Sequence, residues 1–135
     1  MIKMDKRGQL SIEFVLIIAF MLILVLLFSS YIGDANEQNT ISAAAKTGAM
    51  DSASSLFINK TINQPIQVQD LNLIKNGTNI NIIIDVSGTI SNSTNTSLTS
   101  KTLQSIANAG YTLNTANSSD PFIVTSRHVY RVIIV

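Results

Sequence analysis

Fifteen consecutive apolar residues, from Phe14 to Phe28, constrain this chain of 135 residues more than any other feature. With the next four residues the segment reaches Ile32, and as an α-helix it would be about 28 Å long. That length is just enough to cross the hydrocarbon core of a bilayer. Basic residues precede the segment and acidic residues follow it, so the positive-inside rule predicts that the amino terminus stays in the cytoplasm. The rest of the chain is then predicted to be exported.

One acidic residue, Glu13, lies at the start of this segment. A carboxylate there costs a few kcal/mol unless it lies at the membrane interface or has a partner. One interpretation is a carboxylate at headgroup depth with no further role. The residues around it favour a second interpretation.

The basic pair Lys6-Arg7 is followed by Gly8-Gln9-Leu10-Ser11-Ile12-Glu13-Phe14 and then by the apolar run. This arrangement resembles the class III signal sequence of archaeal type IV pilins. The resemblance implies that a prepilin peptidase cuts on the cytoplasmic side, between Gly8 and Gln9, and leaves the apolar helix on the mature subunit. Glu13 is then the fifth mature residue, and Glu13 and Phe14 belong to the assembly segment. Archaellins usually carry a more Gly-rich start and are a poorer match.

The same resemblance implies a function and a set of partners. The chain would be the structural subunit of a pilus for surface attachment, located in a cell-surface filament, with a membrane-anchored precursor whose leader is cytoplasmic. Its partners would be identical or related pilin subunits, the prepilin peptidase and, before assembly, the membrane. In related pilins the acidic residue meets the new amino terminus of a neighbouring subunit, here the amine of Gln9.

The composition excludes several other classes of protein. Cleavage after Gly8 leaves six basic and seven acidic residues, a net charge of −1, which argues against binding to nucleic acid. Cysteine is absent and His128 is the only histidine, so a histidine metal cluster is impossible. We expect no enzyme activity, because no catalytic constellation is present, and no cofactor or metal site. A weak calcium site made of Asp and Asn residues stays open as an alternative, although no loop with EF-hand spacing is present. Three acidic residues are far apart in sequence: Asp70, Asp85 and Asp120.

The chain is predicted to be α+β, with a long helix followed by a small, mainly antiparallel β head domain. We assign residues 1–8 to the leader, 9–58 to the helix, of which 9–32 form the membrane or filament-core segment, and 59–135 to the extracellular head. After the apolar run, small and apolar residues recur at three- and four-residue steps, which predicts an amphipathic second half. The members of this stripe are Ile32, Ala35, Ile41, Ala44 or Ala45, Gly48 or Ala49, Ser52 and Leu56.

In the head, Asn76-Gly77 lies between two alternating runs and predicts a β-hairpin whose second strand, residues 79–87, faces the core. Residues 88–100 are nearly all Ser, Thr and Asn and predict an exposed loop. A helix from Leu98 or Thr99 to Ala109, a third strand at 111–115 and one or two strands within 122–135 follow. The apolar carboxyl terminus predicts a strand that is central in a sheet of about four strands or is covered by the long helix. Arg127, His128 and Arg131 are expected to be solvated edge residues.

Five Asn-x-Ser/Thr sequons follow the long helix and are possible N-glycosylation sites. They begin at Asn59, Asn76, Asn92, Asn95 and Asn117. All lie on the side predicted to be exported, and Asn92, Asn95 and Asn117 lie in predicted loops, which favours them.

Other functions remain open. A single-pass membrane-anchored surface protein would need the same helix but no processed Gly8-Gln9 junction. A minor pilin or archaellin-like subunit would share the leader without forming the main filament. A secreted protein would use residues 1–35 as an ordinary signal peptide, and an exported enzyme lacks candidate residues.

Overall fold

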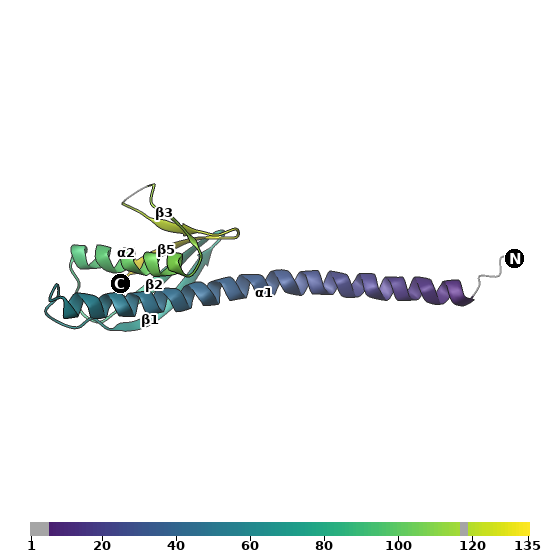
Figure 1. Cartoon of the computed structure of the whole chain (residues 1–135), viewed down its shortest axis with the longest axis horizontal. Coiled ribbons are helices and arrows are strands. Elements are labelled where there is room, and N and C mark those ends of the chain that lie inside the picture. Colours follow the sequence, from purple (N-terminus) through teal and green to yellow (C-terminus); the bar gives the residue numbers. More distant parts are fainter. Residues whose placement is uncertain (1–5, 117–118) are drawn as a thin grey trace. The chain divides into compact units, whose positions relative to one another are not determined.

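The computed structural model describes residues 6–116 and 119–135, with side chains from Ser11 onward. The chain divides into two compact units, Met1–Glu37 and Gln38–Val135. The helix α1 contributes to both units, and every other element belongs to the second (Figure 1). The elements are α1 (Lys6–Ile58), β1 (Val68–Asn76), β2 (Asn79–Val86), α2 (Asn92–Asn108), β3 (Thr112–Asn114), β4 (Phe122–Val124) and β5 (Val129–Ile134). The α+β prediction is confirmed.

The five strands form one sheet in the order β1-β2-β5-β4-β3. The predicted hairpin is present: β1 and β2 are antiparallel, and Asn76 is paired with Asn79 across the turn. Gly77 has a φ of 63°, a conformation that favours glycine. Two positions were predicted for the apolar carboxyl terminus, a central strand or a strand covered by the long helix. β5 lies between β2 and β4, which confirms the first.

The prediction of a mainly antiparallel sheet is confirmed, with two details that the sequence analysis did not specify. The sheet has five strands rather than about four. Most pairs are antiparallel, but β5 runs parallel to β2, with Asn79 beside Val129 and Ile84 beside Ile134. A parallel pair requires a long connection, and here that connection contains α2, β3 and β4.

The core of the second unit lies on one face of this sheet. The alternation in β2 places Ile80, Ile82 and Ile84 in the core, fully buried, as predicted. Tyr130 of β5 is buried beside them. The last part of α1 and the helix α2 cover this face and complete a single apolar cluster. Val86 is buried as well, and the remaining residues of β2 are exposed or half-buried.

The last turns of α1 and the helix α2 pack closely against each other. A side chain at Gly48 would place its Cβ 2.4 Å from the Cβ of Ser105. The hydroxyl of Ser105 donates a hydrogen bond of 3.1 Å to the backbone carbonyl of Ala44. The predicted stripe therefore packs against α2 of its own chain. Six of its members are buried: Ile41, Ala45, Gly48, Ala49, Ser52 and Leu56.

The start of α2 contradicts the predicted loop at residues 88–100. The helix begins at Asn92, and Ser91 caps it by accepting a hydrogen bond of 3.2 Å from the amide of Thr94. Serine is a favoured N-cap residue, and the hydroxyl of Thr96 bonds the carbonyl of Asn92 one turn earlier. A sequence rich in Ser, Thr and Asn thus forms a helix here because one side of it, including Thr94 and Leu98, is buried.

The prediction of solvated edge positions is wrong for two of three residues. His128 is buried, and its ring meets that of Tyr130 edge to face at 5.9 Å. Arg131 lies on β5, a central strand, where its guanidinium is 3.1 Å from the carboxylate of Asp120 and lies over the ring of Phe122. Arg127 is exposed, in the turn before β5.

Candidate functional site

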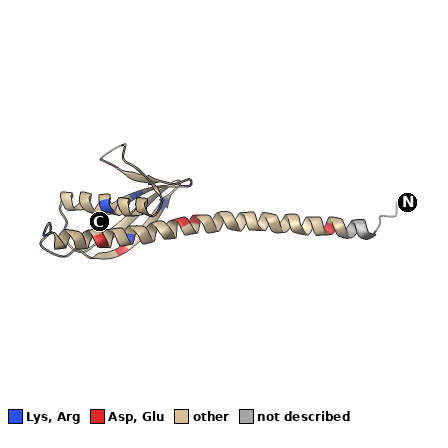
Figure 2. Ribbon diagram, viewed as in Figure 1, with Lys and Arg blue, Asp and Glu red and all other residues tan. Residues whose placement is uncertain are grey.

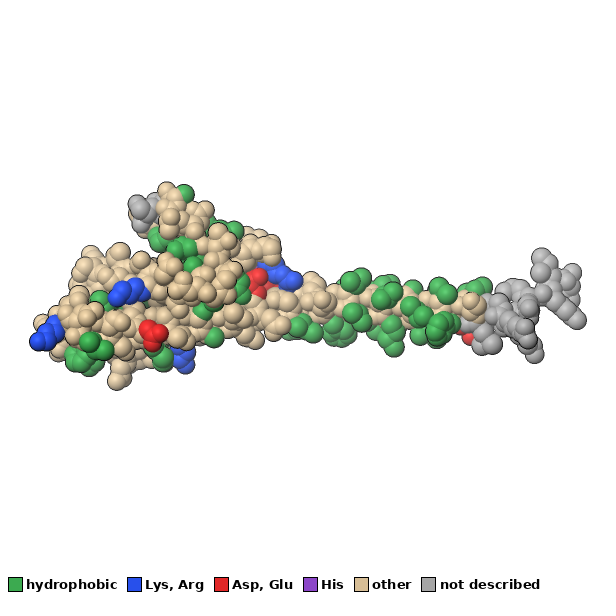
Figure 3. Space-filling view, in the orientation of Figure 1, with side chains coloured by type: hydrophobic (Ala, Val, Ile, Leu, Met, Phe, Trp, Pro, Cys, Tyr) green, Lys and Arg blue, Asp and Glu red, His purple; other side chains and the backbone are tan. Residues whose placement is uncertain are grey.

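The first unit contains an apolar helical segment, residues 12–32, that the other described residues leave largely exposed. Every large apolar side chain from Ile12 to Ile32 except Leu24 is exposed, with exposed fractions between 43% and 76%. Four consecutive residues, Phe14 to Ile17, are each about 60% exposed. Because successive residues differ by about 100° around a helix, the segment is apolar on every side. Figure 3 shows these hydrophobic side chains along α1, next to the residues drawn in grey.

Such a helix needs an apolar environment from outside the chain. Leaving a large apolar side chain in water costs about 1.5–3 kcal/mol, and the segment carries many of them. By length and composition it can cross a membrane, and none of its most apolar stretch is buried within the described chain. A helix that is hydrophobic all round is a membrane span or the core of an assembly.

Glu13 is the only charged residue between Ser11 and Gly33, and its side chain is exposed. A long stretch of α1 without charge follows it (Figure 2). Phe14, beside it, is 63% exposed. Neither residue is therefore held by contacts that bury it within the chain. The segment presents one carboxylate at the beginning of an otherwise apolar surface.

The predicted cleavage junction lies inside the helix. α1 begins at Lys6, so both Gly8 and Gln9 have helical backbone, while their side chains lie outside the described residues. The first amides of a helix have no intrahelical acceptor, and helix ends open at little cost in free energy. The bond between Gly8 and Gln9 thus lies in the first turn of α1, where opening of the helix costs little.

The sequons have different environments in the second unit. Asn59 follows the end of α1, and Asn76 lies at the hairpin turn; both are exposed. Asn92 and Asn95 lie in the first turns of α2, which contradicts their assignment to a loop. Asn117 lies outside the described residues.

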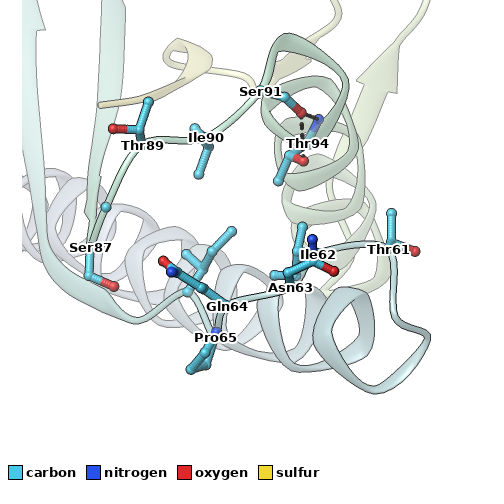
Figure 4. A pocket seen from close by; sticks show the side chains of 12 residues that line it. Thr61, Ile62, Asn63, Gln64, Pro65, Ser87, Thr89, Ile90, Ser91 and Thr94 are labelled. Carbon is cyan, nitrogen blue, oxygen red and sulfur yellow. Dashed lines mark hydrogen bonds between the residues drawn. The ribbon is translucent and has the colours of Figure 1, made fainter.

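The second unit also contains an open pocket (Figure 4). It is formed by the connection from α1 to β1 and the connection from β2 to α2, and its volume is about 610 Å³. Its lining is uncharged: Thr61, Ile62, Asn63, Gln64, Pro65, Ile66, Ser87, Gly88, Thr89, Ile90, Ser91 and Thr94. Since none of these side chains titrates near neutral pH, the pocket offers neither a general acid or base nor a carboxylate or imidazole ligand for a metal ion.

The structure brings together two of the three acidic residues that sequence separates. Asp70 and Asp85 are opposite each other in β1 and β2, next to an irregularity in the register. Asp120 instead pairs with Arg131. Within the described residues no three His, Cys, Asp or Glu side chains are grouped as metal ligands. The pairing of Asp70 and Asp85 could not be seen in the sequence, because it depends on the register of the hairpin.

Comparison with known families identifies the amino-terminal segment. Residues 6–32 match the family model for the class III signal peptide. The chain carries a class III signal peptide. The match supports the prediction of a type IV pilin-like protein, and the matched residues contain both the predicted cleavage junction and the exposed apolar helix. No curated protein and no solved structure matches the chain.

This assignment gives the apolar helix its general role. A class III signal peptide indicates a pilin-like or archaellin-like precursor that prepilin peptidase processes. It also implies pilin-type assembly and fits a membrane-anchored precursor destined for secretion. The exposed segment from Ile12 to Ile32 is therefore the candidate functional site.

Proposed function

We propose that this chain is the structural subunit of an archaeal type IV-like pilus, assembled through its apolar amino-terminal helix after the leader is removed. The observation that carries the proposal is the exposure of a helix that is apolar on every side, directly after a class III signal. In the precursor this helix lies in the membrane. Once the bond between Gly8 and Gln9 is cut, the helix leaves the lipid only where equivalent helices of other subunits surround it in place of the lipid.

Packing of many copies meets this need. A repeated heterologous contact that does not close generates a helical filament. In such a bundle each exposed side chain between Ile12 and Ile32 is covered by a neighbouring helix. The second unit, which has its own core, then forms the outer surface of the filament.

Glu13 gives the bundle its register in this proposal. A carboxylate buried among apolar helices is unfavourable unless it is paired. The new amine of Gln9 on a neighbouring subunit supplies the opposite charge. Pairing would then occur only after cleavage, so that processing precedes assembly.

The filament is proposed to lie outside the cell and to serve surface attachment, without enzyme activity. Attachment is supported by the family resemblance and by a second unit that presents uncharged polar side chains, among them those of the pocket. A single-pass surface anchor and a minor or archaellin-like subunit are the competing functions, because each would carry the same helix.

The mature amino terminus tests the proposal. It is measured by mass spectrometry on the membrane fraction and on high-molecular-weight material sheared from cells. A start at Gln9 in sheared material is the expected result. A start at Asn36 in the medium would indicate a secreted protein, and an intact Met1 confined to the membrane would indicate a simple anchor.

Attachment needs a separate experiment. Cells that lack the chain, cells complemented with it and cells complemented with Glu13→Leu are compared for binding to a surface. Only the unchanged chain is expected to restore attachment. Normal attachment by cells that lack the chain would refute the adhesive role and leave the filament proposal intact.

A further inference from the structure

The two side chains that define a sequon are placed differently by a helix and by a turn. In an α-helix residues i and i+2 are about 200° apart around the axis, so they do not share a face. In extended chain, residues i and i+2 point to the same side. A transferase must reach both the asparagine amide and the hydroxyl two residues later, so backbone conformation decides whether a folded sequon can be used.

The sequons of α2 have the helical arrangement. Asn92 is exposed, but Thr94 is only 6% exposed and its hydroxyl lies 2.9 Å from that of Ser91. Asn95 and Ser97 are both half-buried, and the side-chain oxygen of Asn95 accepts a hydrogen bond of 3.3 Å from the hydroxyl of Thr99. In each sequon at least one of the required groups is engaged within the fold.

The sequon at Asn76 has the opposite properties. It crosses the two-residue turn between β1 and β2, and Asn76, Gly77 and Thr78 are all exposed. The positive φ of Gly77 turns the chain without a side chain between the asparagine and the threonine. Both required side chains are open to solvent on a hairpin tip.

The sequon at Asn59 also lies outside helical structure. α1 ends at Ile58, and Lys60 has a φ of 57°, which breaks the helical path between Asn59 and Thr61. All three residues are exposed. Lys60 itself is the single non-glycine residue in the described chain with positive φ.

We propose that Asn59 and Asn76 are the N-glycosylation sites of the folded chain and that Asn92 and Asn95 are not. The donor is an oligosaccharide linked to a lipid through phosphate. The asparagine amide nitrogen forms a bond to the anomeric carbon of the first sugar, the bond from that carbon to the phosphate oxygen breaks, and the lipid phosphate leaves. The amide loses one proton to the transferase. Asn117 lies outside the described residues and has no part in the proposal.

The test compares the folded chain with its own peptides. Four synthetic peptides of equal length, centred on the four sequons, are used to select a single-subunit oligosaccharyltransferase that glycosylates all of them. The full chain in detergent micelles is then incubated with the same enzyme and lipid-linked donor, and occupancy at each site is read by glycopeptide mass spectrometry. In the folded chain, Asn92 and Asn95 are expected to be modified at no more than about one tenth of the rate in their peptides, because α2 must first open locally. Asn59 and Asn76 are expected to keep nearly their peptide rates.

A variant of the helix cap separates structure from sequence preference. Ser91→Ala removes the N-cap and should increase opening of the first turn, so modification of Asn92 is expected to rise about fivefold. Ser91→Asp retains a capping oxygen and serves as the matched control, with no rise expected. Circular dichroism measures whether both variants remain folded. If the alanine variant is unfolded, the rates at the four sites of the unchanged chain, compared with the peptide rates, still test the proposal.

Three results would overturn the proposal. The first is that Asn92 or Asn95 is modified as fast in the folded chain as in its peptide. The second is that Asn59 and Asn76 are not modified in the folded chain. The third is that Asn92 is modified at the same rate in the unchanged chain and in the Ser91→Ala variant. None of these results depends on filament formation, so the inference stands or falls separately from the pilus proposal.

Discussion

The two parts of α1 have the same secondary structure and opposite surroundings. Residues 12–32 expose nearly all of their large side chains, whereas Ile41 and Ala45, farther along the same helix, are fully buried. The first part has bulky apolar residues on every side, whereas the second is buried on one side, where small residues such as Ala45 and Gly48 lie. The difference shows that helix formation alone does not decide what a helix contacts. A stripe of small residues fits the chain's own α2, while an all-apolar surface requires partners from outside the chain.

The largest effect is expected from the single charge of the apolar part. Glu13→Leu should abolish filaments while leaving cleavage and membrane insertion intact, because the carboxylate is needed for pairing with a neighbour and not for insertion. The matched control is Asp51→Leu, which removes an exposed acidic residue from the second part of α1. Electron microscopy of sheared material and the mass of the membrane-bound chain measure assembly and cleavage. Normal filaments from the Glu13 variant would refute the pairing.

The same substitution in both parts of α1 should have very different effects on folding. Ile41→Ala removes a fully buried side chain and should lower the free energy of unfolding of the second unit by about 2–5 kcal/mol. Ile17→Ala, at a position 59% exposed, should leave that free energy unchanged. Denaturant unfolding of the full chain in detergent micelles, followed by circular dichroism, measures both. An equal loss of unfolding free energy in the two variants would show that both parts of α1 pack against the second unit to the same extent.

The close approach of α1 to α2 gives a smaller effect. Gly48→Leu places side-chain atoms where Ser105 lies and should lower the free energy of unfolding by about 3 kcal/mol, since overpacking forces the backbone to shift. Thr47→Leu, at the neighbouring exposed position, is the control and should change stability by no more than about 0.5 kcal/mol. Thermal unfolding in micelles distinguishes the two. An unchanged melting temperature for the Gly48 variant would mean that α1 and α2 are farther apart than in this structure.

The smallest effect is expected from one hydrogen bond between these helices. Ser105→Ala keeps the Cβ but removes the donor to the carbonyl of Ala44, which should lower the free energy of unfolding by about 1 kcal/mol. Ser100→Ala, on an exposed position of the same helix, should have no such effect. If the two serine variants were equally stable, the bond would contribute nothing to the packing of α1 on α2.

Local patterns in the sequence predicted much of the fold. The hairpin at Asn76-Gly77 and the burial of alternate residues in β2 are properties of neighbouring residues, and both are present. Local pattern failed at α2, where Ser91 and Thr94 resemble loop residues by type but cap a helix and fill its buried side. The cap could have been found by considering Ser91 together with the apolar residues that follow at helical spacing.

The sequence by itself determined the apolar segment and its signal, because an unbroken run of apolar residues after a basic leader needs no tertiary contact to be recognised. Only the tertiary structure decided that β5 lies parallel to β2, that Asp70 lies opposite Asp85, and that the sequons of α2 are engaged while those at Asn59 and Asn76 are exposed. The strand pairs join residues that are not neighbours in the chain, and the sequons of α2 are engaged because one side of that helix is buried against the core. Such pairing is set by the joint packing of the sheet and both helices, and no short stretch of sequence contains it.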